Sequence, residues 1–114
     1  MKLTVKLRIP EAYTSQDGKQ PFYEWLRKLK DLQGKARIIR RIDRAASGNF
    51  GVYRDLQSGV HELKEDFGPG YRIYFGIVDD EVILLLAGGD KKSQERDVTK
   101  AREYWTDYLW RNKQ

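Results

Sequence analysis

Cysteine is absent from the 114-residue chain, and histidine occurs once, as His61. These absences exclude disulfides, zinc–thiolate centres, thiol nucleophiles and any metal site built from several histidines. No apolar run approaches the ~20 residues needed to cross a bilayer, and the N-terminal segment alternates polar and apolar residues instead of forming a signal-peptide core. We therefore expect a cytoplasmic protein that contacts no membrane and uses neither a cofactor nor a metal.

Positive charge is in excess and is concentrated in one segment. The chain has 22 Lys and Arg residues against 17 Asp and Glu residues, which gives a net charge of +5. Between Arg27 and Arg44 the basic residues stand at positions 27, 28, 30, 35, 37, 40, 41 and 44, and only Asp31 and Asp43 oppose them. Such a segment is typical of contact with a polyanion or an acidic protein, and it is also typical of a solvated helix face. Composition leaves both interpretations open.

The periodicity of the apolar residues predicts a single α+β domain over residues 1–114. Alternation indicates strands at 3–9, 52–57, 60–66, 71–78 and 81–87, and recurrence every three or four residues indicates helices at 21–32, 35–48 and 93–110. Gly34 is expected to separate the first two helices. The stretch "VILLLA" is apolar on both faces, so we place it centrally in the sheet and expect "GGD" to end it. The predicted order is an N-terminal strand, a two-helix hairpin, an antiparallel β-meander and a C-terminal helix.

Two of these elements have a clear inner and outer face. In the first strand the apolar residues are expected inside and Arg8 outside. In the second helix the isoleucines and alanines are expected to face the sheet, and the basic residues to face the solvent. The outward residues of this helix are Lys35, Arg37, Arg40, Arg41 and Arg44.

A polar row accompanies the apolar row of the stretch "HELKEDFGPGYRIYFGI", residues 61–77. If Leu63, Ile73 and Phe75 face the helices, the pleat sends the other parity to the opposite face, which we expect to be exposed. The residues expected there are Lys64, Asp66, Arg72 and Tyr74. A cross-strand ion pair between Asp66 and Arg72, worth ~0.2–1 kcal/mol, would explain part of this row without any function.

The polar row and the following loop "GGDKKSQ" together suit chemistry on a phosphate. A helix N-terminus with added lysines favours phosphate. RNA supplies its own nucleophile, the 2′-hydroxyl, so its cleavage needs in-line positioning, proton transfer and cations over the developing charge. Lys64 or Tyr74 could transfer the protons, and Arg72 with Lys91 or Lys92 could hold the phosphate. Tyr71 or Tyr74 could stack on a base.

Four stretches in this order, "PFYEWLRKLKD", "GNFG", "GVHELKEDFGPGYRIYFG" and "LLLAGGDKKSQERDVTKAREYW", resemble the addiction-module killer proteins, a HigB-like branch of the RelE/ParE toxin superfamily. The resemblance covers residues 17–108. It implies a RelE-like fold, a type II toxin–antitoxin pair and a cognate helix-turn-helix antitoxin (HigA-like). It also implies metal-independent mRNA cleavage at the ribosome, which inhibits translation.

The resemblance assigns roles to particular residues of this chain. Lys64 and Arg72 match catalytic strand positions, and Lys91 matches a cation in the loop after the last strand. The substrate-binding candidates are Tyr71, Tyr74, Lys92 and Gln94. Candidate contacts to ribosomal RNA or to the antitoxin are Lys35, Arg37, Arg40, Arg41 and Arg44. The C-terminal tyrosine that some RelE enzymes use has no counterpart, because the matching region reads "QERDV".

Two other functions stay open on the sequence. The ParE branch has nearly the same fold but inhibits DNA gyrase without cleaving RNA, and a fold does not decide between such functions. In that interpretation the C-terminal helix and tail would carry the activity. In a third interpretation the chain is a DNA-associated partner protein that uses the basic helix, residues 35–44, as its contact.

Overall fold

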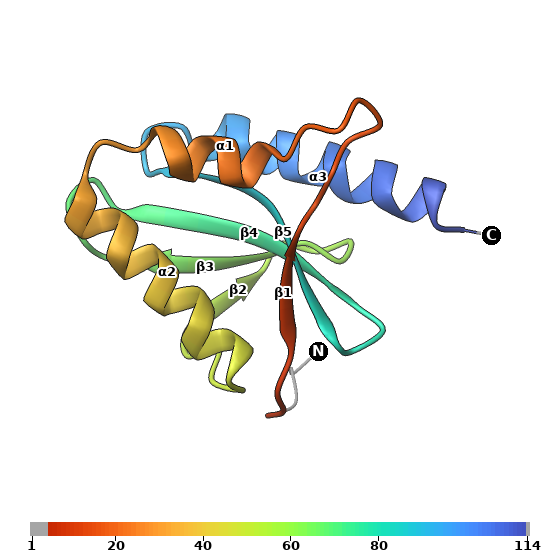
Figure 1. Ribbon diagram of the computed structural model, residues 1–114, viewed down its shortest axis with the longest axis horizontal. Coiled ribbons are helices and arrows are strands. Elements are labelled where there is room, and N and C mark those ends of the chain that lie inside the picture. The colour runs from red at the N-terminus through yellow and green to blue at the C-terminus, as the bar shows by residue number, and fades with distance from the viewer. Residues whose placement is uncertain (1–4, 114) are drawn as a thin grey trace.

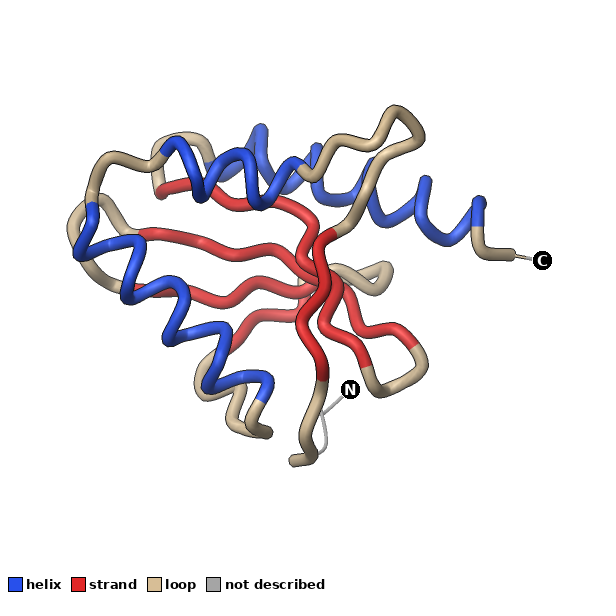
Figure 2. Tube along the Cα trace, viewed as in Figure 1, coloured by secondary structure: helices blue, strands red, loops and turns tan. Residues whose placement is uncertain are grey.

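A five-stranded sheet separates two helical layers in the computed structural model, which describes residues 5–113 (Figure 1). The elements in chain order are β1 (Ile9–Ala12), α1 (Pro21–Lys28), α2 (Leu32–Ala46), β2 (Tyr53–Asp55), β3 (His61–Glu65), β4 (Tyr71–Val78), β5 (Val82–Asp90) and α3 (Gln94–Arg111). The sheet order is β1-β5-β4-β3-β2, in which β1 runs parallel to β5 and the other neighbours are antiparallel (Figure 2). The predicted α+β class and element order are confirmed.

The two faces of the sheet carry two separate cores. Leu63, Ile73 and Phe75 pack against α1 and α2, as the side-chain parity predicted. Tyr74 lies on the opposite face with Trp105 of α3. That second face was expected to be open, but α3 covers it and buries Tyr74, Leu84, Leu86 and Ala87. Among the described residues, no helix is both long and apolar enough to cross a membrane.

The strand β5 is interior, as predicted, but it runs on through "GGD" to Asp90. The two glycines stay in the strand because helices approach them closely from both sides. A Cβ at Gly88 would lie 2.3 Å from the Trp25 ring of α1, and a Cβ at Gly89 would overlap the carboxylate of Asp97 in α3. The glycines therefore serve helix packing, and they do not end the strand.

The N-terminal strand prediction is wrong in position and in face. β1 begins at Ile9 and contains Pro10, and residues 3–4 lie outside the described part of the chain. Val5, Leu7 and Ile9 are exposed, whereas Arg8 is buried and its Nη2 lies 2.7 Å from Oδ1 of Asp80. The amide of Ile9 donates to the carbonyl of Glu81, just before β5, and that of Tyr13 donates to Leu85 of β5. Residue 10 therefore has its nitrogen on the open edge, where a proline loses no hydrogen bond.

The boundary between the first two helices lies before Gly34, which corrects the predicted break. Asp31 is the N-cap of α2, and its carboxylate accepts a hydrogen bond from the Gly34 amide at 2.9 Å. The Tyr71 hydroxyl donates to the same carboxylate at 2.7 Å. Asp31 thus begins α2 and fastens it to β4, while α1 already ends at Lys28.

The outward face of α2 is also smaller than predicted, because Arg41 is buried. Its guanidinium donates to the carbonyls of Phe50 at 2.6 Å and Val52 at 2.9 Å. Ile39, expected inside, is exposed instead. Arg41 therefore holds the segment between α2 and β2, and it is not a surface cation.

Candidate functional site

The three predicted catalytic cations line one hollow of about 290 Å³ at the end of the β3–β4 hairpin. Lys64 on β3 lies directly opposite Arg72 on β4. Lys91 reaches the same hollow from the loop after β5, where its amide lies 3.5 Å from the Pro69 carbonyl. The lining residues are Lys64, Asp66, Gly68, Pro69, Gly70, Arg72 and Lys91. The cluster proposed from sequence therefore exists as one place on the surface.

Arg72 is fixed in this hollow and does not extend freely into solvent. It was expected on an exposed face, but only 5% of it is accessible. Its Nη1 donates to the Gly70 carbonyl at 3.0 Å, and its Nε lies 3.7 Å from Oε2 of Glu62. A guanidinium has five N–H donors in a rigid plane, so the donors not used inside the protein can serve a ligand in the hollow.

Asp66 pairs with Lys64 and does not form the cross-strand pair with Arg72 that the sequence suggested. The Lys64 ammonium lies 3.5 Å from Oδ1 of Asp66, and both side chains are well exposed. An exposed pair of this kind is weak, ~0.2–1 kcal/mol, so an anion can readily displace the carboxylate from Lys64. The hollow is thus able to receive one more negative group.

Glu62 is the residue of this site that sequence reasoning missed. It has the same parity as Lys64, two residues before it on β3, and it lies opposite Tyr74. Only 1% of it is accessible. Oε2 accepts a hydrogen bond from Nε2 of Gln94 at 3.1 Å, and Oε1 lies 3.6 Å from Nη1 of Arg54. The side-chain parity of β3 places Glu62 on the same face as Lys64. It does not reveal the partners of Glu62, because these come from α3 and β2.

Neither tyrosine that was expected to stack on a base can reach the hollow. Tyr74 is fully buried under α3, and burial together with the nearby Glu62 carboxylate raises the pKa of its hydroxyl. Tyr71 lies on the other face of the sheet beside Trp25, and burial with the hydrogen bond to Asp31 raises its pKa to about 12. Both are core residues, so Lys64 is the one proton-transfer candidate of the original two that lines the hollow.

The two remaining substrate-binding candidates lie on α3 or just before it, and neither lines the hollow. Gln94 is partly buried and turned toward Glu62. Lys92 is exposed and lines a separate hollow of about 500 Å³, together with Ser93, Glu95, Arg96, Thr99 and Lys100. The loop before α3 therefore contributes Lys91 to the site, and the first residue of α3, Gln94, donates a hydrogen bond to Glu62.

The basic residues of α2 divide into a buried member and a set at the surface. Arg40 and Arg44 are exposed. Arg37 lies over the Phe67 ring, 4.3 Å from its centroid, and 3.9 Å from Glu65. Lys35 donates to a backbone carbonyl of α1 at 3.3 Å. Arg41 does not belong to this surface, as described above.

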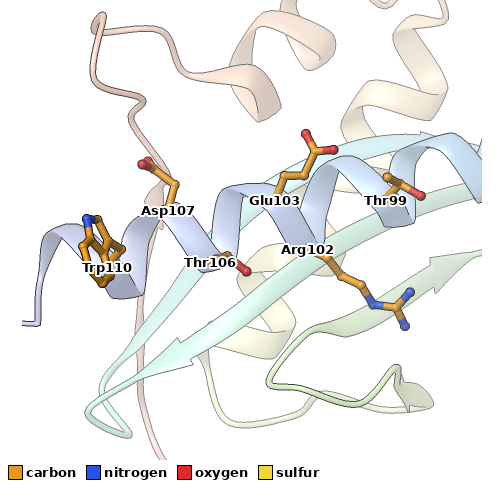
Figure 3. A pocket seen from close by; sticks show the side chains of 6 residues that line it. All are labelled: Thr99, Arg102, Glu103, Thr106, Asp107 and Trp110. Atoms are coloured by element: carbon orange, nitrogen blue, oxygen red, sulfur yellow. The ribbon is translucent and has the colours of Figure 1, made fainter.

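A larger hollow, about 570 Å³, lies on the outer face of α3 (Figure 3). Its lining residues are Thr99, Arg102, Glu103, Thr106, Asp107 and Trp110, and the Trp110 residue is 69% exposed. It shares no residue with the hollow of Lys64 and Arg72. This face contains the exposed end of the C-terminal helix.

Fold and site together define a small α+β protein with a cationic hollow at one end of its sheet. Across residues 5–113, no group of three His, Cys, Asp or Glu residues has the arrangement of a metal site.

No family model matches the chain. A protein from Haemophilus influenzae, described as uncharacterized, is 43% identical over 81 residues, which cover 71% of this chain and 82% of that protein. The chain belongs to the same family as the Haemophilus protein.

Proposed function

We propose that the chain is the toxin of a type II toxin–antitoxin pair, with a RelE-like fold, and that it cleaves mRNA at the ribosome without a metal. The observation that supports this function best is the convergence of Lys64, Arg72 and Lys91 on one hollow. Three cations around a space of about 290 Å³ suit a single phosphodiester group. The resemblance of the hairpin and loop sequences to the RelE/ParE toxins supports the same assignment.

The proposed reaction is an attack of the 2′-hydroxyl of RNA on the adjacent phosphorus. The O2′–P bond forms, the P–O5′ bond breaks, the 2′ proton leaves to a base and the 5′ oxygen receives a proton. Negative charge grows on the two non-bridging oxygens in between, and fixed cations lower the barrier most when they face those oxygens. Arg72 is the most rigidly held cation of the hollow, so we assign it to this charge.

The two lysines have different positions and therefore different proposed roles. Lys64 stands opposite Arg72 on the hairpin and is assigned to proton transfer. Lys91 enters from the far side of the hollow and is assigned to holding the phosphate in line. Tyr74 is not assigned, because its hydroxyl is buried and its pKa is raised.

The proposed partners are an antitoxin of the helix-turn-helix class (HigA-like) and ribosomal RNA around the mRNA channel. Arg37, Arg40 and Arg44 are the exposed basic residues of α2 available for either contact. Both partners would bind through charge, so affinity should fall steeply as salt is raised.

The direct test is to add the protein to a translating extract and map the mRNA ends. We expect new ends with wild type, and strongly reduced cleavage with Lys91→Ala and Arg72→Lys. Arg72→Lys is preferred to Arg72→Ala, because alanine would remove one of the two cations that pair with the buried Glu62 carboxylate, the other being Arg54. Lys19→Ala serves as a surface control, because Lys19 is exposed in the loop before α1 and belongs neither to the hollow nor to the basic residues of α2. Intact mRNA together with halted DNA replication would overturn the proposal.

A gyrase inhibitor of the ParE type is the second candidate, and the exposed Trp110 favours it. Buried aromatic anchors dominate many protein interfaces, and Trp110 stands beside the larger hollow of α3 (Figure 3). Truncation after Tyr104 cannot test this function, because it would remove Trp105 from the core. Trp110→Ala is the suitable variant: loss of toxicity with an unaltered hollow would favour gyrase, and retained toxicity would exclude α3 as the inhibitory element.

A further inference from the structure

We propose that Glu62 is a positioning residue, which holds the Arg72 guanidinium in the orientation that a phosphate requires. The inference rests on the function proposed for the hollow, since it concerns the same arginine. Glu62 does not line the hollow, so it acts through Arg72 and does not contact the ligand itself.

The guanidinium of Arg72 is held at two of its edges. Nη1 donates to the Gly70 carbonyl at 3.0 Å, and Nε faces Oε2 of Glu62 at 3.7 Å. The Nε–Oε2 distance is too long for a hydrogen bond, so Glu62 orients the guanidinium through its charge, while the Gly70 carbonyl accepts a hydrogen bond from it. Without Glu62, only a carbonyl in the turn between β3 and β4 would orient Arg72.

The Glu62 carboxylate is itself held from two directions. Gln94 donates to Oε2 from the first turn of α3, and Arg54 lies 3.6 Å from Oε1 on the β2 side. Arg54 pairs directly with Glu62 across β2 and β3, while Arg72 is its diagonal neighbour on β4. Burial of 99% of the residue removes the freedom that a surface glutamate would have.

This arrangement determines which N–H donors of Arg72 face the hollow as well as where the guanidinium lies. A carboxylate behind the guanidinium leaves the donors on the opposite side for an anion, and it lies outside the lining of the hollow. Asp66 cannot do this, because it lies beside Lys64 at the exposed rim. A buried carboxylate is costly unless it is paired and hydrogen-bonded. Oε2 of Glu62 accepts the hydrogen bond from Gln94, and Oε1, which accepts no hydrogen bond from the described residues, is stabilised by the charge of Arg54 at 3.6 Å.

The test uses inorganic phosphate as the probe and the Nε–Hε signal of Arg72 in ¹⁵N-labelled protein as the readout. In wild type we expect one sharp Arg72 signal that moves as phosphate is added. In Glu62→Gln, which keeps the shape but removes the charge, we expect an altered, broadened signal and phosphate binding weaker by roughly tenfold. Glu65→Gln is the matched control, because Glu65 is on the same strand and faces a different arginine, Arg37.

A second variant keeps the test decisive if Glu62→Gln folds poorly. Gln94→Ala removes one hydrogen bond to the carboxylate and leaves its charge, so phosphate binding should weaken by a smaller factor in the same direction. In an Arg72→Lys background, Glu62→Gln should cost little further affinity, since the residue acts through Arg72.

The outcomes separate this inference from the proposed function. An unchanged Arg72 signal and unchanged phosphate affinity in Glu62→Gln would overturn the positioning role, whether or not RNA is cleaved. If phosphate binding depends on Glu62 but the protein leaves mRNA intact, the positioning role would be supported and the proposed nuclease function would be overturned.

Discussion

Replacing Arg41 tests whether the basic helix is partly a structural element, and the structure supplies a magnitude. Its guanidinium makes short hydrogen bonds to the carbonyls of Phe50 and Val52, at 2.6 and 2.9 Å. Hydrogen bonds from a charged donor contribute about 1.5–3 kcal/mol each. Val52 is exposed, so water can replace Arg41 there, whereas Phe50 is buried and its carbonyl would be left without a donor.

A third contact, from Nε of Arg41 to the Lys64 carbonyl at 3.5 Å, is at the limit of a hydrogen bond and adds little. The expected decrease in the free energy of unfolding for Arg41→Ala is therefore smaller than the sum of two full hydrogen bonds. One stranded carbonyl costs about 1–3 kcal/mol, and loss of the buried side-chain stem adds to it. Removing the charge recovers part of the cost of burying it, since burial and the neighbouring Arg44 already lower the pKa of Arg41. We expect a decrease of about 2–4 kcal/mol in the free energy of unfolding.

Urea unfolding followed by circular dichroism measures this decrease, with the m-value as a check on two-state behaviour. Arg41→Met should lower the free energy of unfolding less than Arg41→Ala, because methionine retains the packing of the aliphatic part of the side chain. Arg40→Ala, one residue away on the exposed face, should stay within about 0.5 kcal/mol of wild type. An Arg41→Ala protein as stable as Arg40→Ala would refute the reasoning.

Three further outcomes are expected. Tyr13 and Tyr71 have pKa values raised to about 12, mainly by burial, so their absorbance should not change near pH 10.0, and the stability they contribute should be lost as the pH rises toward 12. Hydrogen bonds from Gly34 and Tyr71 lower the pKa of Asp31, so its contribution is present above pH 3.8 and lost on further acidification, and Asp31→Asn should flatten that acid limb. Gly76→Ala should destabilise by about 1–3 kcal/mol in thermal unfolding, because its Cβ would lie 2.3 Å from the Trp105 ring, and a Trp105→Leu background should reduce the loss.

Much of the fold follows from local patterns in the sequence. The alternation in residues 71–78 gave the bounds of β4, and the same parity correctly placed Leu63 and Ile73 against the helices. The turn at Asp79 and Asp80 has positive φ at both residues, 53° and 57°, as a two-residue hairpin requires. These features depend on neighbours within a few residues, which is why periodicity could predict them.

The wrong predictions share a cause, which is contact between segments far apart in the chain. The alternation placed Arg8 on the outer face of a strand, yet it is buried against the Phe50 ring and pairs with Asp80, and both of these residues are far from it in the sequence. Arg41 followed the outward pattern of its helix, but the segment before β2 folds over it. Helical and strand periods carry no information about such partners.

The candidate site divides in the same way. Parity placed Lys64 and Arg72 side by side, and the loop sequence added Lys91, so the cations of the hollow were predictable. The burial of Arg72 was not, because it depends on the Gly70 turn and on Glu62, which Gln94 of α3 holds in place. Glu62 was missed because a glutamate on a strand expected to be solvated has no evident role.

That burial changes how the three cations can share the proposed work. Lys64 and Lys91 have accessible side chains, so salt screens them, and they suit the capture of an approaching polyanion. Arg72 is held against Gly70 and Glu62 with little water around it, where a charge interacts more strongly and need not reorganise. In the proposed reaction, the surface lysines therefore attract RNA to the hollow in addition to their assigned roles in proton transfer and phosphate positioning, and the buried arginine distinguishes the transition state from the bound substrate.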